Sequence, residues 1–137
     1  MITAVDSSVV LDVLTDDPAH AGPAERVLRQ ASLQGQLIVC ECVLAEVFPA
    51  LGDRERFRQF LTDWQIEFVP SNVESATLAG EMFFQFLKRG RERKRTLADF
   101  LVGAHAVVHA DRLVARDRGY LRDHFADLKL LDPSKPG

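Results

Sequence analysis

Residues 2–12 are Ile-Thr-Ala-Val-Asp-Ser-Ser-Val-Val-Leu-Asp, and this stretch decides the fold that we expect for the chain. Its first four residues are mostly apolar and predict a short buried strand. Asp6 and two serines interrupt the apolar run, and the apolar spacing that follows, through Leu14, predicts a helix. A strand without polar alternation is typical of a parallel sheet that is covered on both faces.

The same alternation of short apolar runs and helical spacing continues to the end of the chain. Further strands are expected at residues 37–40, 66–69, 113–115 and 128–130. Helices are expected at residues 23–34, 43–51, 53–64, 72–89, 97–110 and 118–124. Pro49 is expected to end or kink its helix, and Ser71 or Asn72 to cap the helix that follows. The alternation predicts an α/β fold with a short, mostly parallel central sheet flanked by helices.

Length and composition narrow the class of protein. The chain has 137 residues, so residues 1–137 are expected to form a single domain. Hydrophobic residues make up 47% and charged residues 27%, which argues against a disordered or collagen-like chain. No apolar run approaches the roughly 20 residues that span a bilayer, and no signal peptide is apparent. Cys40 and Cys42 are expected to be reduced thiols, which are typical of a cytoplasmic protein. The net charge of -3 excludes a globally basic nucleic-acid-binding protein, but not a local basic patch.

Two acidic residues follow expected strands closely. Asp6 comes directly after residues 2–5, and Asp117 comes two residues after 113–115. In open parallel sheets the active crevice lies beyond the carboxyl ends of the strands, so both carboxylates are expected in or near one crevice. Each also has a structural alternative, because Asp6 can cap the next helix and Asp117 can form a turn.

Two further carboxylates lie on apolar helices. Glu46 has apolar neighbours three and four positions away on both sides, where a carboxylate needs a partner, a metal or an edge position that reaches water. Asp99 lies in the first turn of a helix that is apolar nearly all round, and with Thr96 it has the form of a capping box. Asp99 can cap the helix and still bind a cation. Gly103 is expected to leave open space on the same face.

Four carboxylates in one crevice predict a cation and a type of chemistry. Their charges repel one another where the dielectric constant is low, so they need a compensating positive charge. Mg²⁺ prefers oxygen ligands, and it holds waters and phosphate oxygens beside one or two carboxylates. The chemistry that follows is metal-assisted hydrolysis of a phosphodiester. Neither a serine–histidine–acid arrangement nor a Walker-type glycine loop is found in the sequence as a competitor.

Five stretches of the chain, taken in order, resemble motifs of the PIN domain family. They are residues 5–12, 44–47, 98–106, 116–120 and 128–133. The resemblance covers essentially the whole chain, and it is greatest to the VapC-type toxins of bacterial toxin–antitoxin pairs. It implies a PIN-like α/β domain that acts as an endoribonuclease dependent on Mg²⁺ or Mn²⁺.

The resemblance also implies the roles of particular residues. Asp6, Glu46, Asp99 and Asp117 correspond to the acidic quartet that binds the metal and catalyses hydrolysis, and Ser8 corresponds to a hydroxyl that orients Asp6. Asp6 and Asp99 are the first choices for direct ligands. The implied partners are an RNA substrate, a small VapB-like antitoxin and a second copy of the chain in a homodimer, with no membrane involved.

Two other functions stay open at this stage. Ala115 stands where the family often has Thr or Ser, so the chain could instead be a PIN-like module that binds RNA or a protein without cleaving. Asp6 could also be the aspartyl nucleophile of a phosphatase, although Ser8 stands where such enzymes usually carry a second Asp. The four acids favour the nuclease, since a pure binding module has no need of a repulsive cluster.

The remaining motifs have competing explanations. Positive charge is concentrated at residues 88–95, which fits either a solvated helix end or a loop that contacts RNA phosphates. The residues considered for such contacts are Arg93, Lys94, Arg95, Arg116 and Arg118. His105 and His109 have a spacing that can hold zinc, but no third ligand is apparent and packing is favoured.

Overall fold

The computed structural model describes residues 1–90, 95–116 and 119–135. In this part of the chain the strands form one sheet in the order β3-β2-β1-β4-β5, and every pairing in it is parallel. The strands are β1 (Ile2–Val5), β2 (Gln36–Val39), β3 (Ile66–Phe68), β4 (Arg112–Val114) and β5 (Leu130–Leu131). The prediction of an α/β fold with a short parallel sheet is therefore confirmed.

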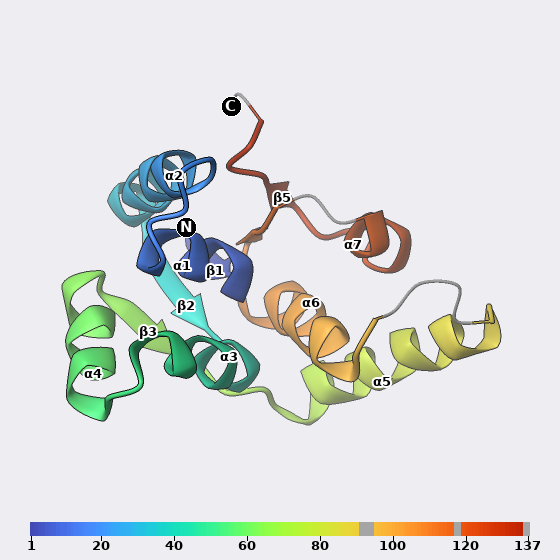
Figure 1. Ribbon diagram of the computed structural model, residues 1–137. Coiled ribbons are helices and arrows are strands. Elements are labelled where there is room, and N and C mark those ends of the chain that lie inside the picture. The colour runs from blue at the N-terminus through green and yellow to red at the C-terminus, as the bar shows by residue number, and fades with distance from the viewer. Residues whose placement is uncertain (91–94, 117–118, 136–137) are drawn as a thin grey trace.

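Helices connect the strands and cover both faces of the sheet. They are α1 (Ser7–Leu14), α2 (Ala21–Gln34), α3 (Glu41–Leu51), α4 (Arg54–Asp63), α5 (Val73–Lys88), α6 (Leu97–His109) and α7 (Gly119–His124). In Figure 1, α2 lies on one side of the sheet, and α5 and α6 lie on the other. The central strands β1, β2 and β4 are mostly buried and mostly apolar, as expected of strands that are covered on both faces, whereas the edge strand β3 has an exposed Glu67. Within the described ranges, no helix is both long enough and apolar enough to cross a membrane.

The observed boundaries differ from the expected ones by a few residues, and two differences have a clear cause. Cys40 does not end β2 but is the N-cap of α3. Of the two outcomes expected at Pro49, an end or a kink of the helix, the first is wrong, because α3 continues to Leu51 and ends where Gly52 takes a left-handed conformation, at φ 66°. A proline this close to the helix C-terminus removes one backbone donor, whereas glycine adopts positive φ without strain.

The start of α5 is fixed to the start of α3. Asn72, one of the two residues expected to cap α5, does so through Oδ1, which accepts a hydrogen bond from the Ser75 amide at 2.8 Å. Ser71 instead donates to Oε1 of Glu41, from its amide at 2.9 Å and from its hydroxyl at 2.7 Å. These hydrogen bonds hold the connection between β3 and α5 in place.

A cluster of aromatic rings holds α6 in the core. Phe100 is fully buried, and its ring centroid lies 5.5 Å from that of Phe83 and 5.4 Å from that of Phe86, both on α5. The expectation of open space beside Gly103 is wrong, because the ring of Phe125 fills it. A Cβ atom at Gly103 would lie 2.5 Å from Cε2 of Phe125, so glycine permits this close approach.

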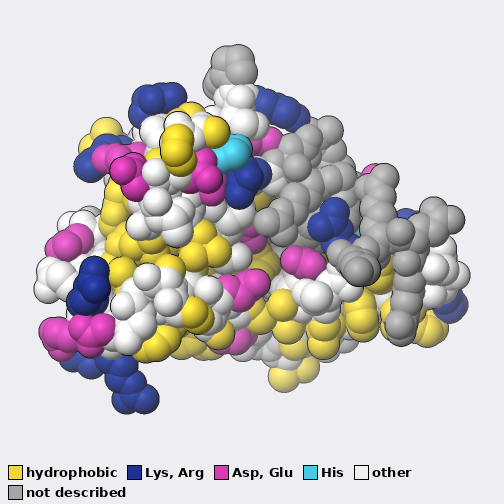
Figure 2. Space-filling view, viewed as in Figure 1, with side chains coloured by type: hydrophobic (Ala, Val, Ile, Leu, Met, Phe, Trp, Pro, Cys, Tyr) yellow, Lys and Arg dark blue, Asp and Glu magenta, His cyan; other side chains and the backbone are white. Residues whose placement is uncertain are grey.

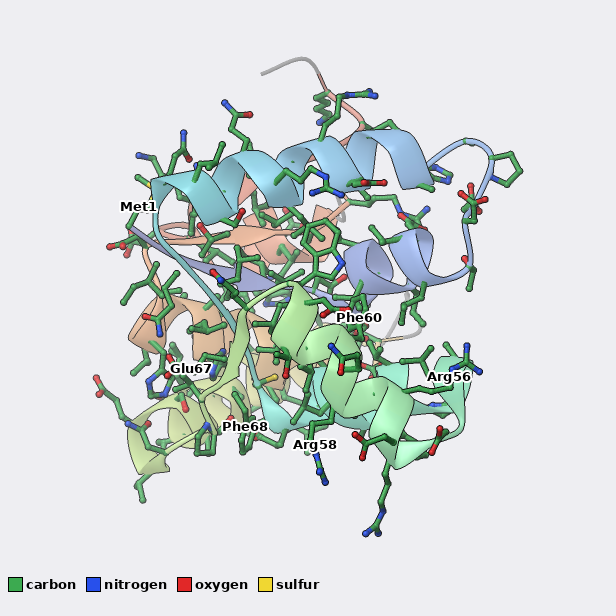
Figure 3. All side chains as sticks on the ribbon, turned by 90° about the vertical axis from the view of Figure 1, so that its left-hand side faces the viewer. Met1, Arg56, Arg58, Phe60, Glu67 and Phe68 are labelled. Atoms are coloured by element: carbon green, nitrogen blue, oxygen red, sulfur yellow. The ribbon has the colours of Figure 1, made fainter. Side chains whose placement is uncertain are left out.

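The helix α4 lies at an outer surface of the fold. None of its residues is buried, although Phe57 and Phe60 pack against the core from its inner side. Arg56 and Arg58 are exposed and point away from the fold (Figure 3). The helix therefore has the apolar inner side and polar outer side that its amphipathic spacing predicts.

Candidate metal centre

Asp6 lies where β1 ends, and it is the N-cap of α1. Its Oδ2 atom accepts hydrogen bonds from the Ser8 hydroxyl at 2.5 Å and from the Ser8 amide at 3.2 Å. The Asp6 amide donates to the Val114 carbonyl at 2.9 Å, which joins the ends of β1 and β4. The residue is buried, with 6% of its surface exposed. Asp6 thus caps a helix and also lies at the carboxyl end of the sheet, where the crevice is expected.

Glu46 reaches the turn that carries Asp6. The Ser7 hydroxyl donates to Oε1 of Glu46 at 3.2 Å, across 39 positions of the sequence. Glu46 is exposed, and so is Pro49, three positions further along the helix. Of its helical neighbours three and four positions away, only Val43 is buried. Glu46 therefore lies at the edge of the apolar stripe and reaches water, which is one of the alternatives that the sequence left open.

Asp99 caps α6, as its spacing from Thr96 indicates. Its Oδ2 atom accepts hydrogen bonds from the Thr96 amide at 3.0 Å and from the Thr96 hydroxyl at 3.2 Å. The residue is half-buried. Its helix contacts both β1, which leads into Asp6, and α3, which carries Glu46. Capping therefore fixes the Asp99 side chain without removing it from solvent.

The described acids offer the oxygen donors that a hard divalent cation prefers. Asp6, Glu46 and Asp99 lie on or beside elements that contact one another, namely β1, α1, α3 and α6. Figure 2 shows acidic side chains near the middle of this face, over α1, α3 and α6. Among the described residues, Oδ1 of Asp6 accepts no hydrogen bond, while Oδ2 is held by Ser8. A donor set of carboxylate oxygens fits Mg²⁺ or Mn²⁺, and in it Ser8 fixes one oxygen of Asp6 while no described residue donates to the other.

Several predicted residues lie outside the part of the chain that the structure describes. These are Asp117, Arg93, Lys94 and Arg118. The place of Asp117 beside the other acids and the contacts of the three cations with RNA therefore stay predictions. Arg95, also considered for RNA contacts, is half-buried.

Asp12 is a buried acid that sequence reasoning did not select. Arg116 holds it at two points: Nε lies 3.0 Å from Oδ2, and Nη2 donates to Oδ1 at 3.2 Å. Burial raises the pKa of Asp12, and the Arg116 guanidinium opposes that rise. Asp12, Asp17 and His20 offer ligand atoms that all lie within 4.8 Å of one another. Arg116 pairs with Asp12, and His20 Nδ1 lies 3.0 Å from Asp17 Oδ1, so these side chains already have partners within the protein.

His105 packs inside the fold, and the two cysteines are free thiols. His105 is buried, and its Nε2 donates to the Val69 carbonyl at 2.7 Å. Burial lowers the pKa of His105, which keeps the ring neutral near pH 7. Packing, the role favoured from the sequence, is thus what the structure shows for this residue. Cys40 and Cys42 are free thiols, and burial raises the pKa of Cys42 to about 12.

Comparison with known proteins places the chain in a family. The family model for the PIN domain matches residues 3–124. No curated protein matches the chain. Among solved structures, the chain is similar to VapBC2 from Rickettsia felis bound to a promoter DNA fragment, at 17% identity and a TM-score of 0.73, over 96% of this chain and 98% of that chain.

Two further solved structures have a similar fold. VapBC-1 from nontypeable Haemophilus influenzae is 18% identical, with a TM-score of 0.72 over 98% of this chain and 100% of that chain. VapC20 from Mycobacterium tuberculosis, a toxin that cleaves the sarcin–ricin loop, is 18% identical, with a TM-score of 0.60 over 93% of this chain and 98% of that chain. With the family model matched over most of its length, the chain belongs to the PIN domain family.

Proposed function

We propose that this chain is a metal-dependent endoribonuclease, a VapC-like toxin that hydrolyses RNA phosphodiester bonds. The observation that carries the proposal is the placement of Asp6. It follows the central strand β1, Ser8 holds its Oδ2, and no described residue donates to its Oδ1. The likeness to VapC20, a toxin that cleaves the sarcin–ricin loop, supports RNA as the substrate class.

In this proposal Asp6, Glu46, Asp99 and Asp117 hold Mg²⁺ or Mn²⁺, with Asp6 and Asp99 as direct ligands. When bound, the cation polarises a phosphoryl oxygen and lowers the pKa of the attacking water. The chain orients the carboxylates, through Ser8 at Asp6 and through the capping hydrogen bonds at Asp99. Attack of water on phosphorus expels the 3′ oxygen, which leaves a 5′-phosphate and a 3′-hydroxyl.

Cleavage of cellular RNA by the purified protein tests this function. We expect cleavage with Mg²⁺ or Mn²⁺, none with EDTA, and products that carry 5′-phosphates. Cleavage that survives EDTA, or products with 3′-phosphates, would contradict the proposed chemistry. Absence of cleavage in all metals, together with no stabilisation of the fold by Mn²⁺, would favour a binding module.

Ser7 is a residue that sequence reasoning missed, and its removal is expected to weaken catalysis. Because Ser7 joins Glu46 to the turn that carries Asp6, Ser7→Ala frees the Glu46 carboxylate on that side. Loss of a partner that orients a metal ligand typically costs about 10–100-fold, so we expect kcat/KM to fall about 10-fold. Steady-state cleavage of one RNA substrate measures kcat/KM for both proteins, and the midpoint of thermal unfolding checks that the variant is folded.

Ser71→Ala is the matched control for this prediction. Ser71 also donates a hydroxyl hydrogen bond to a glutamate, Glu41, but neither residue belongs to the proposed site. We expect this variant to cleave RNA at the wild-type rate. An equal loss in both variants would show that Ser7 acts through stability alone.

We also propose a small VapB-like antitoxin and a second copy of this chain as partners. Similar solved structures include VapBC2 and VapBC-1. Large apolar side chains are exposed on the described parts of α5 and α6, namely Val73, Phe84, Leu97 and Val107. Exposed apolar groups of this kind mark interfaces. Light scattering on the purified chain is expected to show a dimer, and a monomer at high concentration would contradict the homodimer.

A further inference from the structure

A buried ion pair joins α1 to the segment that follows β4. Asp12, on α1, has 7% of its side chain exposed, whereas 39% of the Arg116 side chain is exposed. Arg116 meets both carboxylate oxygens, at 3.0 Å and 3.2 Å, from 104 positions away in the sequence. The contact from Nη2 to Oδ1 is a hydrogen bond, and the contact from Nε to Oδ2 is an ion-pair contact without one; together they hold the two side chains to each other.

A backbone hydrogen bond lies near this ion pair. The amide of Asp6, the N-cap of α1, donates to the Val114 carbonyl at 2.9 Å. Six residues later, about 9 Å by helical rise, Asp12 holds Arg116. Residues 114–116 are therefore held at the start of α1 and again at Asp12. Two connections fix the position of α1 relative to the end of β4.

The pair also changes the role expected for Arg116. An arginine that contacts RNA presents its guanidinium to phosphate oxygens. Here the guanidinium already meets a carboxylate that is almost fully buried. Removing Arg116 would leave the Asp12 charge buried without its partner, which is strongly destabilising in proteins. The geometry thus gives Arg116 a structural partner within the chain rather than an open cationic end.

We infer that Asp12 and Arg116 are positioning residues for the proposed nuclease, which hold α1, and with it Asp6 at the start of that helix, against the end of β4. The inference rests on the proposed function. Asp6, a proposed metal ligand, is the N-cap of α1, and Asp12 lies on the same helix. Through this shared helix the pair acts on catalysis without contacting RNA.

Kinetics of Asp12→Asn and Arg116→Lys distinguish positioning from RNA contact. Arg116→Lys keeps the positive charge but loses the two-point geometry. If the pair positions the site, both variants lose kcat by about 10-fold, and KM for RNA changes less than about 2-fold. The double variant then loses little more than either single variant, because both act through one interaction. If Arg116 instead contacts RNA phosphate, Asp12→Asn releases the Arg116 guanidinium and lowers KM for RNA. Arg116→Lys then keeps most of the cleavage activity. That result would overturn the inference.

Controls separate this role from stability and from the proposed function. Glu25→Gln is the control variant. Glu25 pairs with Arg29 within α2, with contacts of 2.7 Å and 3.0 Å, and loss of this pair is expected to leave kcat unchanged. Variants of the pair that lower the thermal midpoint yet keep wild-type kcat would overturn the positioning role. If the wild-type protein neither cleaves RNA nor is stabilised by Mn²⁺, the proposed function fails and the inference fails with it. An active wild type with unchanged variants overturns the inference alone.

Discussion

Asp6→Asn is expected to reduce RNA cleavage about 100-fold or more, because a bound metal contributes several kcal/mol to the transition state and each 1.4 kcal/mol is about tenfold in rate. Asparagine is as good an N-cap as aspartate, so it can keep the hydrogen bonds to Ser8 that start α1. The variant therefore loses the charge that a cation needs while keeping the fold. Initial rates with saturating Mn²⁺ measure the loss, and circular dichroism checks the fold.

Asp53→Asn is the matched control for Asp6→Asn. Asp53 is also an N-cap, and its Oδ1 accepts from the Glu55 amide at 3.3 Å at the start of α4, outside the proposed site. This control should cleave RNA at the wild-type rate. If Asp6→Asn retained more than about a tenth of the wild-type rate, Asp6 would not be a metal ligand, since ligand loss costs more than this.

Phe100→Ala is expected to lower the free energy of unfolding by about 3–5 kcal/mol, the usual cost of removing a fully buried aromatic ring. Phe100 has no exposed surface, and its ring lies among those of Phe83, Phe86 and Phe125, with centroid distances of 5.5 Å, 5.4 Å and 6.4 Å. Removing the ring leaves a cavity between α5 and α6. Urea unfolding of the wild type and the variant measures the difference.

Phe68→Ala is the comparison for this stability change. Phe68 lies on the edge strand β3, is 46% exposed, and is labelled in Figure 3. Its replacement should cost about 1 kcal/mol or less, as exposed positions usually do. If Phe100→Ala cost no more than Phe68→Ala, the aromatic cluster would not hold α6. Because Asp99 precedes Phe100 directly, a folded Phe100→Ala variant should also bind Mn²⁺ less tightly.

Most strands were predictable because they are short, mainly apolar runs between stretches with helical spacing. Their ends were harder to place, since Cys40 is as apolar as a strand residue yet caps α3. Pro49 shows the limit of a local rule. Proline disfavours helix interiors, but near the end of α3 only one backbone hydrogen bond depends on it, and the helix ends at Gly52 instead.

The candidate site was predictable only where its contacts are local. The hydrogen bonds from Ser8 to Asp6 and from Thr96 to Asp99 span two and three residues, and the sequence shows both pairs. The sequence left the exposure of Glu46 open, because spacing on a helix does not tell which side of that helix is covered. The hydrogen bond from Ser7 to Glu46 crosses 39 positions, so no local pattern reveals it.

The ion pair between Asp12 and Arg116 was missed for the same reason. It crosses 104 positions, and Asp12 looks like an ordinary polar residue on the first helix. The expectation of open space beside Gly103 was also wrong, because the sequence does not show which side chain packs there. A glycine on an apolar helix suggests free space, but only the folded chain shows that Phe125 occupies it.

The central claim is that Asp6 and Asp99 bind a divalent cation together with Glu46 and Asp117. Thermal melting of the wild type and of Asp99→Asn, with Mn²⁺ and with EDTA, tests this claim most directly. Ligand at about 100 times its dissociation constant adds roughly 2.7 kcal/mol, so we expect the wild-type midpoint to rise by roughly 5 °C or more. Asp99→Asn should melt normally in EDTA, since asparagine can still accept from Thr96, and should lose most of the gain from Mn²⁺. A wild type that Mn²⁺ does not stabilise, or an equal gain in Asp99→Asn, would contradict the claim.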